Sequence, residues 1–328
     1  MSEFQSMDNS LVSILVPVYN REEYIEATVA SALAQSHRHI EVVVVDNAST
    51  DSSWDKITKM ALSDSRIRAY RNDQNIGPVR NWIACADLAV GQYAKILWSD
   101  DLISADFLEK TLPLFASDVG FVYSAAQIFD DFGRGDLNYA RDRTGTFNAR
   151  NFIESALYGW DVPYSPGCAI FRTSDLKQYL IADVPNRVDS DFSSHAIGND
   201  LLLMLLVANR YAKLGFVNEP LSLFRHHDNS ISASAQRGKL ALHYNVAKGF
   251  FAQAASIDVA SKKRLNAAFA IDLLRYRGNI WGMTTIGDFY NADDITKIDL
   301  SFLIVRVLKG VVRSTNRRIA GLFKRHVR

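Results

Sequence analysis

The chain has 328 residues, of which 48% are hydrophobic, and a formal net charge of +1 at pH 7. This composition can bury a substantial core, so it excludes a disordered or fibrous protein and predicts one large domain or a domain with an appendage. The two cysteines, Cys85 and Cys168, lie far apart without metal-type spacing. We therefore expect two small core residues, and neither a disulfide framework nor a zinc site.

The two ends of the chain differ from its middle. The first ten residues, MSEFQSMDNS, are polar and acidic, which predicts a flexible N-terminus, argues against a secretory signal peptide and favours a cytoplasmic protein. No apolar run reaches the roughly 18 to 20 residues that a membrane-spanning helix needs. Residues 297–328 contain nine Lys and Arg against a single acid, Asp299, a net of +8 that leaves −7 for the rest. The tail is therefore electrostatically distinct.

Residues 11–101 alternate between strand and helix patterns. Short β-branched apolar runs predict strands, and apolar residues at helical spacing predict the helices between them. The expected elements, in order, are a strand over 11–19, a helix over 21–35, a strand over 40–46, a helix over 52–62, a strand over 66–71, a helix over 78–88 and a strand over 93–98. Such alternation is typical of a mainly parallel sheet that helices cover on both faces.

Polar clusters follow each of these four strands. They read PVYNRE at 17–22, DNASTD at 46–51, RNDQNIGPVRN at 71–81 and SDD at 99–101. Ligands of such sheets bind beyond the carboxyl ends of the strands, although Asn, Asp, Ser and Gly are also ordinary turn and cap residues. Neither a Gly-x-Gly-x-x-Gly nor a Walker motif occurs, which disfavours a nicotinamide-dependent enzyme or a P-loop nucleotidase.

Several of these stretches together resemble a known family. VSILVPVYNREEYIEATVASALAQSHRHIEVVVVDNASTDSS, NDQNIGPVRNWIACA, GQYAKILWSDD and GND occur in the order and spacing of the family 2 glycosyltransferases, over roughly residues 11–235. The resemblance implies an α/β GT-A fold, which is Rossmann-like with a mainly parallel mixed sheet flanked by helices. It also implies a nucleotide-sugar half over about 11–101 and an acceptor half over about 102–235.

Within the first half, the resemblance assigns donor-binding residues to the strand ends. The nucleotide-sugar set is Pro17, Tyr19, Asn20, Asp46, Asn47, Arg71, Asn75, Arg80 and Asp100. Asp46 would accept a hydrogen bond from the base, as a carboxylate can from the N3–H of uracil or thymine. An arginine of this set could pair with a diphosphate, whereas Arg80 could equally be a solvated charge on a helix face. Asp51 is a weaker candidate, because it is well placed to cap the next helix.

The sequence WSDD matches the acidic motif with which this family binds a divalent metal. Mn²⁺ or Mg²⁺ prefers oxygen ligands and would bridge a carboxylate to the diphosphate. Trp98 stands where the first Asp often stands, which makes Asp100 the expected ligand and Asp101 a second ligand or a hydroxyl acceptor. His227, in the stretch FRHHDNS, would complete the metal or diphosphate site by the same resemblance.

The acceptor half would supply the general base. The resemblance places Asp200 in this role, with Asn199 in place of the usual first acid, and an inverting transfer needs such a carboxylate to take the proton of the acceptor hydroxyl. A helix N-cap is the alternative interpretation of Asp200. The stretch 130–151 is expected to be an irregular excursion over the site. The acceptor pocket is assigned weakly to Trp160, Tyr164 and Arg172.

Residues 236–328 form a helical C-terminal region in this interpretation, with two packed helices over about 236–283. Within 301–325, apolar residues gather on one helical face and basic residues on the other. The apolar set is Ile304, Leu308, Val311, Val312, Ile319, Leu322 and Phe323, and the basic set is Arg306, Lys309, Arg313, Arg317 and Lys324. The pattern favours an anionic membrane surface over a helix packed on the core or a dimer contact. No nucleic-acid module accompanies the charge.

Together these patterns predict a metal-dependent, inverting glycosyltransferase. It would move a sugar from a nucleotide-diphosphate donor, UDP- or dTDP-linked, to an acceptor hydroxyl, in particular that of a lipid-linked glycan in surface polysaccharide assembly at the cytoplasmic face of a membrane. Two alternatives stay open: a non-catalytic nucleotide-sugar-binding protein, suggested by Trp98 and Asn199, and a nucleotidyltransferase, which should carry a Gly-rich signature after the first strand. The sugar, the acceptor and the oligomeric state are left open.

Overall fold

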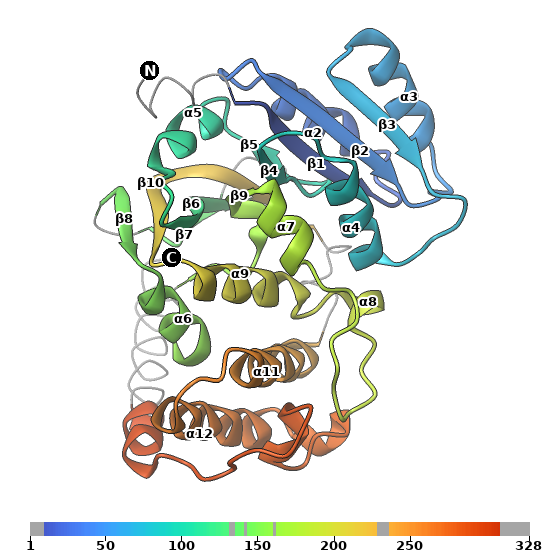
Figure 1. Ribbon diagram of the computed structural model, residues 1–328. Helices are drawn as coiled ribbons and strands as arrows, with labels where there is room; N and C mark the ends of the chain where they lie inside the picture. Colours follow the sequence, from blue (N-terminus) through green and yellow to red (C-terminus); the bar gives the residue numbers. More distant parts are fainter. Residues whose placement is uncertain (1–9, 131–134, 141–142, 160–161, 228–235, 309–328) are drawn as a thin grey trace, which may run out of the picture. The chain divides into compact units, whose positions relative to one another are not determined.

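The computed structural model describes residues 10–130, 135–140, 143–159, 162–227 and 236–308 (Figure 1). These residues form two compact units. The first runs up to Val184 and resumes over Asp191–Gln236, and the second joins Pro185–Ser190 to the chain from Arg237 onward.

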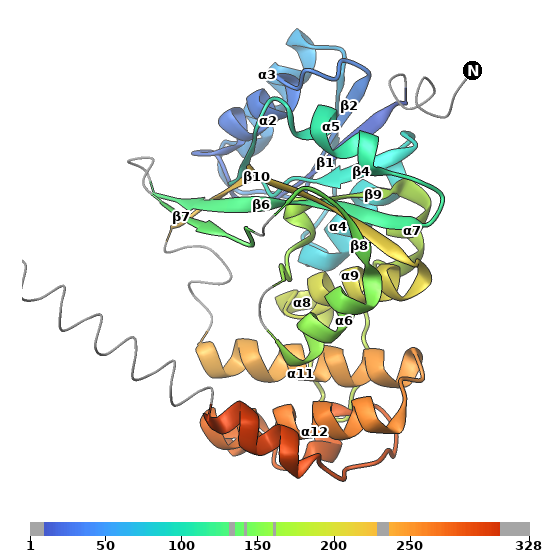
Figure 2. The same cartoon turned by 90° about the vertical axis from the view of Figure 1, so that its left-hand side faces the viewer.

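The first unit is built on a mixed ten-stranded sheet with the order β3-β2-β1-β4-β9-β6-β10-β5, in which β7 pairs with β6 and β8 pairs with β10. The strands are β1 (Val12–Val18), β2 (Ile40–Asp46), β3 (Ile67–Arg71), β4 (Tyr93–Ile96), β5 (Leu102–Ile103), β6 (Val119–Phe129), β7 (Gly135–Asn138), β8 (Gly145–Asn148), β9 (Ala169–Arg172) and β10 (Lys213–Arg225). Strands β1 to β4, β6 and β10 share one direction, and the short β5, β7, β8 and β9 run against them. Figure 2 shows β6 and β10 side by side.

Helices follow the strands of this sheet, and the first three of them are those that the sequence predicts over 21–88. They are α2 (Ile25–Leu33), α3 (Ser53–Ser63), α4 (Pro78–Leu88), α5 (Phe107–Thr111), α6 (Ala149–Tyr158), α7 (Thr173–Tyr179), α8 (Phe192–His195) and α9 (Asn199–Arg210), with 3₁₀ turns η1 (Leu112–Leu114) and η2 (Pro166–Cys168). The start of α4 has a local cause. Gly77 adopts φ +84°, which only glycine tolerates well, and Pro78 follows at the first helical position with its φ already helical.

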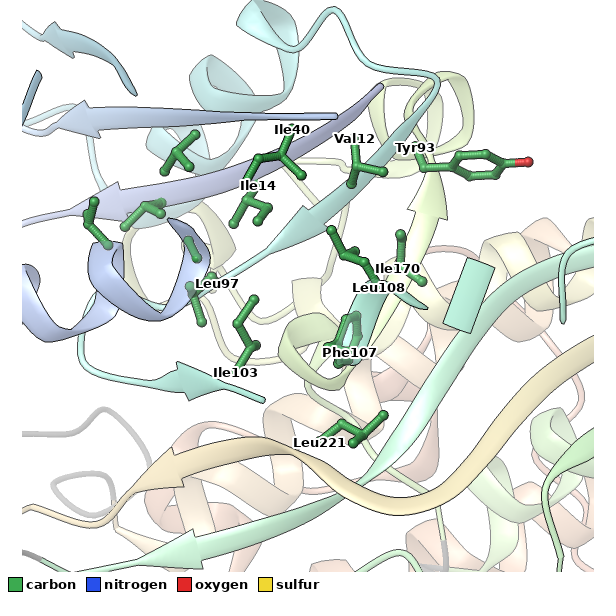
Figure 3. Packing of buried hydrophobic residues seen from close by; sticks show 14 of the residues in the cluster. Val12, Ile14, Ile40, Tyr93, Leu97, Ile103, Phe107, Leu108, Ile170 and Leu221 are labelled. Carbon is green, nitrogen blue, oxygen red and sulfur yellow. The ribbon is translucent and has the colours of Figure 1, made fainter. Parts of the chain in front are cut away.

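The core lies on both faces of the central strands. Every residue of β1 and β2 is buried, because successive side chains point to opposite faces and helices cover each. On one face Val12 and Ile14 pack with Phe107 and Leu108 of α5 (Figure 3). Burial of such a side chain contributes roughly 1.5–3 kcal/mol, so these strands are rigidly placed. Their polar carboxyl ends are thereby held along one edge.

The structure confirms the strand and helix alternation over 11–101, and both cysteines are buried and free. It corrects two expectations. The stretch 219–224, read in the sequence as an edge strand, belongs to β10, which lies between β6 and β5. The stretch 130–151 is not wholly irregular, since it contains β7 and β8. These partner strands have two to four residues, too few for a recognisable alternation.

The second unit is helical. Helices α11 (Arg237–Ala254) and α12 (Val259–Arg275) lie side by side (Figure 2) and confirm the two expected helices. The 3₁₀ turns η3 (Gly278–Trp281) and η4 (Ile286–Phe289) follow, and the rings of Phe269 and Phe289 pack at 4.6 Å. Residues 300–308 are helical, with Ile304 and Leu308 exposed. The rest of the predicted amphipathic segment, 309–325, lies outside the described residues. None of the described helices is long and apolar enough to cross a membrane.

Candidate active site

The four polar clusters meet at one edge of the sheet, as the sequence predicts, because β1 to β4 are parallel. Side chains join the clusters to one another. Asn20 N–H donates to Ser49 Oγ at 2.9 Å, which links the first and second clusters. Arg71 Nε lies 3.2 Å from Asp46 Oδ2, which links the second and third. The fourth cluster is joined to the first by Arg21.

The loop after β1 presents Tyr19 and Asn20 at this edge. The Tyr19 side chain is 43% exposed, so its ring is accessible to a ligand. Asn20 adopts a left-handed backbone with φ +51°, and its Oδ1 accepts the N–H of Thr50 at 2.8 Å. Pro17 differs from the other two, because it is buried within β1 in register with Val45. Pro17 therefore lies beneath the loop, within β1, and does not present its side chain at the edge.

Asp46 ends β2 and is fully buried. Its Oδ2 accepts the N–H of Ser49 at 3.0 Å and pairs with Arg71. Its Oδ1 has no hydrogen-bond partner within the described part of the chain. A buried carboxylate oxygen without a donor is costly, and a donor on a ligand would remove that cost. Arg71 is held in place in turn by the Ser49 carbonyl, at 2.8 Å from Nη2.

Asn47 and Asn75 have structural contacts that the sequence did not reveal. The Asn47 side chain donates to Asn75 Oδ1 at 2.8 Å and accepts the N–H of Ile76 at 3.0 Å. Asn75 Oδ1 also accepts the N–H of Gly77 at 2.9 Å. These bonds hold the loop ahead of α4 against the end of β2. Their proposed contact with the donor stays a prediction.

The other predicted residues of the donor and acceptor sets make structural contacts of their own. The Arg80 guanidinium is exposed and forms an ion pair with Asp183 at 2.8 Å, as a solvated helix residue would. Arg172 lies at the opposite edge of the sheet, beside the start of β4. It is in register with Tyr93, the first residue of β4, and its Nη1 donates to the Val119 carbonyl at 2.5 Å. We therefore leave Arg172 out of the site. Tyr164 donates to the Ala156 carbonyl at 3.1 Å, and Trp160 lies outside the described residues.

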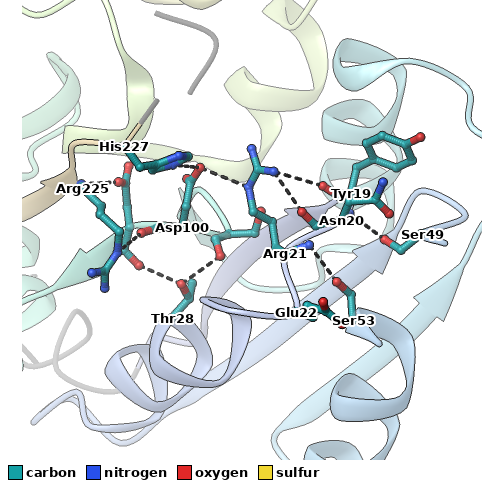
Figure 4. A network of polar contacts seen from close by, with 12 residues as sticks. Tyr19, Asn20, Arg21, Glu22, Thr28, Ser49, Ser53, Asp100, Arg225 and His227 are labelled. Atoms are coloured by element: carbon teal, nitrogen blue, oxygen red, sulfur yellow. Dashed lines mark hydrogen bonds and ion pairs between the residues drawn. The ribbon is translucent and has the colours of Figure 1, made fainter. Parts of the chain in front are cut away.

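The acidic turn after β4 carries a three-residue cluster (Figure 4). Asp100 Oδ2 lies 3.1 Å from Arg21 Nε and 3.0 Å from His227 Nε2. The His227 side chain is 9% exposed, its ring packs on Tyr24 at 5.2 Å, and its Nδ1 is buried without a partner among the described residues. The sequence predicted the Asp100–His227 pair through the resemblance. It did not indicate Arg21, which reads as an ordinary loop residue.

Asp101 has a different environment from Asp100. It is 7% exposed, and its Oδ1 accepts the N–H of Arg225 at 2.8 Å. Its own carbonyl accepts the hydroxyl of Thr28 at 2.9 Å, which ties the turn to α2. Burial raises the pKa of Asp101 well above its ordinary value, and the neighbouring Asp100 charge adds to this. These contacts fit a residue that shapes the turn better than a metal ligand.

Asp100 and His227 fit a divalent cation as two of its ligands. Their facing atoms, a carboxylate oxygen and an imidazole nitrogen, lie 3.0 Å apart in a hydrogen bond, and both are atom types that would bind a divalent cation. No group of three or more His, Cys, Asp and Glu that could hold a metal occurs among the residues the structure describes. Mg²⁺-type ions are commonly held by one or two side chains together with substrate phosphates, so a two-ligand site is chemically reasonable.

Lys95, in β4, is a buried charge close to the acidic turn. Lys95 is fully buried, donates to the carbonyls of Ile96 and Gly167, and lies 4.8 Å from the centre of the Phe107 ring. Burial lowers its pKa to about 8. Its positive charge partly compensates Asp101. A buried lysine inside the apolar run YAKILW is not recognisable from pattern alone.

Trp98 is a packing residue in this structure. Its Nε1 donates to Ser165 Oγ at 3.0 Å, and its ring lies 4.7 Å from that of Trp82. A Cβ on Gly167 would fall 2.5 Å from the same nitrogen, so only glycine permits this approach. The indole therefore fills the position where the family often has an acid. It joins α4 to the turn η2.

Asp200 lies in the first turn of α9, whose N-cap is Gly198 and not Asp200. Its Oδ1 accepts the N–H groups of Gly198 and Leu201 at 3.1 and 2.8 Å. Asn199 is buried and donates to the Ile181 carbonyl at 2.8 Å, which anchors the helix.

Tyr139, a residue the sequence did not single out, adopts φ +63°. Burial raises the pKa of its phenol to about 12, with smaller contributions from Cys168 and Asp200.

Comparison with known proteins agrees with this geometry. A family model described as Glycosyl transferase family 2 matches residues 13–180, slightly more than half of the chain. A glucosyltransferase of Escherichia coli, the UDP-Glc:alpha-D-GlcNAc-diphosphoundecaprenol beta-1,3-glucosyltransferase WfaP, is 36% identical over 123 residues, which are 37% of this chain and 48% of that protein. The putative teichuronic acid biosynthesis glycosyltransferase TuaG of Bacillus subtilis is 40% identical over 102 residues, 31% and 40% of the two chains. These matches span less than half the length of either curated relative.

Among solved structures, S. aureus TarS 1–349 in complex with UDP-GlcNAc matches with a TM-score of 0.60 over 82% of this chain and 74% of that chain, at 18% identity. This likeness shows a GT-A-like fold, with a mixed, mostly parallel sheet flanked by helices. The family model covers the strands and loops that carry Asp46, Arg21 and Asp100. The chain belongs to glycosyl transferase family 2.

Proposed function

We propose that this protein is a glycosyltransferase that moves a sugar from a nucleotide-diphosphate donor to an acceptor hydroxyl. The observation that carries the proposal is that four strand-end clusters, all within the segment that matches the family, meet at one sheet edge, where Asp100 of the fourth cluster pairs with His227. The TarS structure was solved with UDP-GlcNAc, and WfaP is named for a UDP-glucose donor. By analogy we favour a UDP- or dTDP-sugar here.

The donor would lie along the carboxyl edge of β1 to β4. Tyr19 offers an exposed ring to the base, and Asp46 offers Oδ1, an acceptor that has no partner among the described residues. Asp100 and His227 would hold Mn²⁺ or Mg²⁺ at the diphosphate. When bound, the cation would offset the negative charge of the leaving diphosphate. Arg71 adds positive charge at the end of β3, already anchored to Asp46 and Ser49.

Asp200 is the proposed general base of an inverting transfer. Its position in the first turn of α9 favours the ionised carboxylate, because a helix N-terminus stabilises negative charge. Two backbone donors fix its Oδ1. The carboxylate would take the proton of the acceptor hydroxyl as the oxygen attacks the sugar carbon. Tyr164 remains a proposed neighbour of the acceptor.

The acceptor that we favour is a lipid-linked glycan. The name of WfaP includes a diphosphoundecaprenol-linked sugar, and TuaG is named for teichuronic acid biosynthesis. In this chain, Ile304 and Leu308 are exposed on the helix 300–308, and the residues that follow are strongly basic in sequence. An anionic membrane surface at the cytoplasmic face would suit both features.

A thermal-unfolding screen tests the donor and metal assignments together. UDP, dTDP and GDP are added to the full chain with Mn²⁺ or with EDTA, and the midpoint is measured. A nucleotide at a concentration about a hundredfold above its Kd stabilises the folded state by about 2.7 kcal/mol. We expect the Mn²⁺-dependent part of the shift to disappear in Asp100→Ala and to survive in the control Asp118→Ala, whose exposed partner is Lys213.

Two results would contradict the proposal. If no nucleoside diphosphate shifts the midpoint with or without Mn²⁺, the chain does not bind such donors and the function falls. If Asp100→Ala keeps the full Mn²⁺-dependent shift, the metal is held elsewhere and the acidic turn is only structural. A protein that binds the donor but hydrolyses or transfers no sugar would favour the non-catalytic alternative.

A further inference from the structure

Arg21 is the residue of the acidic cluster to which the sequence patterns assigned no role, although it lies within the segment that matches the family. It lies in the loop after β1, next to Tyr19 and Asn20, and its side chain is 22% exposed. Its Nε is 3.1 Å from Asp100 Oδ2, and its Nη1 donates to the Asn20 carbonyl at 3.0 Å. The guanidinium is thus held on two sides, one of them the expected metal ligand.

The backbone beneath Arg21 is equally well fixed. Its N–H donates to Ser53 Oγ at 2.7 Å, and the preceding N–H, of Asn20, donates to Ser49 Oγ. Figure 4 shows this loop bound to Ser49 and to Ser53, the first residue of α3. A side chain that is ordered before a ligand arrives loses little entropy on binding. Arg21 is therefore preorganised at the donor edge.

One arm of the guanidinium remains unused. Within the described part of the chain, Arg21 Nη2 has no hydrogen-bond partner, whereas Nε and Nη1 each have one or more. In Figure 4 this arm points away from the carbonyls of Tyr19 and Asn20. Guanidinium N–H groups recognise phosphate oxygens with strong, charge-assisted hydrogen bonds. A partly exposed, fixed pair of N–H donors beside the proposed metal ligand Asp100 is suited to an anion.

We propose that Arg21 is a donor-binding residue that orients Asp100 through Nε and presents Nη2 to the diphosphate of the nucleotide-sugar. This inference rests on the proposed function and adds a residue to it. Arg21 gives the diphosphate a fixed positive charge that does not depend on the cation. It also compensates Asp100 before any ligand is bound, which explains why two adjacent carboxylates are tolerated at this turn.

The competing explanation is that Arg21 only neutralises Asp100. Under that explanation its removal would disturb the metal ligand and nothing else. Binding in the absence of metal separates the two explanations, because in EDTA a loss of affinity for the phosphates must come from the protein's own groups. The nucleoside without phosphates provides a second separation, since it reports on the base and ribose contacts alone.

The test is isothermal titration of the full chain with UDP, dTDP and GDP and with uridine, thymidine and guanosine, each in Mn²⁺ and in EDTA. The variants are Arg21→Met, which keeps the length and removes the charge, and Arg21→Lys, which keeps the charge and loses the fork. Arg66→Met is the matched control, because Arg66 pairs with Asp64 at 2.7 Å ahead of β3, at the opposite edge of the sheet. Thermal unfolding checks that each variant is folded.

We expect Arg21→Met to bind the preferred diphosphate about 10- to 100-fold more weakly in both Mn²⁺ and EDTA, with nucleoside affinity unchanged and Arg21→Lys intermediate. A loss confined to Mn²⁺, an equal loss for the nucleoside, or no loss at all would each overturn the proposal. If the unmodified chain binds none of the three diphosphates, the proposed function itself fails. That result differs from a failure of the role proposed for Arg21, in which the diphosphate binds the unmodified chain and every variant equally.

Discussion

Replacing the buried Lys95 with methionine gives a pH-dependent change in stability that the structure allows us to calculate. Lys95 has no exposed surface, and burial lowers its pKa from an ordinary value of 10.5 to about 8. Between these two values the unfolded chain binds more protons at this position than the folded chain. The free energy of unfolding must therefore rise with pH over this window.

The size of the effect follows from the difference in pKa. At pH 7 the charged lysine makes the folded state less stable by about 3.4 kcal/mol relative to a neutral side chain with the same contacts, at about 1.36 kcal/mol for each pKa unit. By pH 10 most of this penalty is gone, because the ammonium is deprotonated in the folded state and partly so in the unfolded chain. We expect the stability of the unmodified protein relative to Lys95→Met to rise by about 2.5 kcal/mol between pH 7 and pH 10.

Urea denaturation followed by circular dichroism at pH 7, 8, 9 and 10 measures this difference. Comparison of two chains that differ only at position 95 cancels the titration of other groups, such as Lys248. Leu62→Ala serves as the control, since Leu62 is exposed and cannot titrate, so its difference should be flat. A flat difference for Lys95→Met would refute the reasoning and show that the pKa of Lys95 in the folded state is close to its ordinary value.

Two further substitutions test the base and the supporting shell. Asp200→Asn should lower kcat for sugar transfer by about 10²- to 10⁴-fold while the donor Kd from calorimetry stays the same, and unchanged turnover would remove Asp200 from the mechanism. Trp98→Asp should lower the free energy of unfolding by about 3–5 kcal/mol, because it removes the contacts with Trp82, Ser165 and Gly167; Trp98→Phe should lose less. We expect no gain in Mn²⁺ affinity on Trp98→Asp, and a gain would show that position 98 can still serve as a ligand.

The site residues that belong to recognisable motifs could be predicted from the sequence. Asp100 and His227 are 127 positions apart, yet the resemblance assigned both to the metal or diphosphate site, and their side chains lie 3.0 Å from each other. The same holds for the alignment of the strand ends, because parallel strands must end at one edge. Such features depend on residue type and order, which a sequence records directly.

The supporting contacts were not predictable in the same way. Arg21 reads as a loop arginine, Lys95 as a polar interruption of an apolar strand and Tyr139 as part of an irregular stretch. For two of them the decisive contact is with a residue distant in sequence. Arg21 pairs with Asp100, and Lys95 donates to the Gly167 carbonyl. Trp98 likewise reads as a missing acid, whereas its indole joins α4 to the turn η2.

By itself the sequence determined the alternation of strands and helices, the buried central strands and the family of this protein, because periodicity and motif order act over short or ordered stretches. Only the tertiary structure decided which cations compensate the two carboxylates at 100 and 101, that β10 is covered by β5 and β8, and that Asp101 faces the backbone of Arg225. The physical reason is that charge compensation and strand pairing depend on distances across the fold. Those distances are set by the packing of the whole core, and no local pattern contains them.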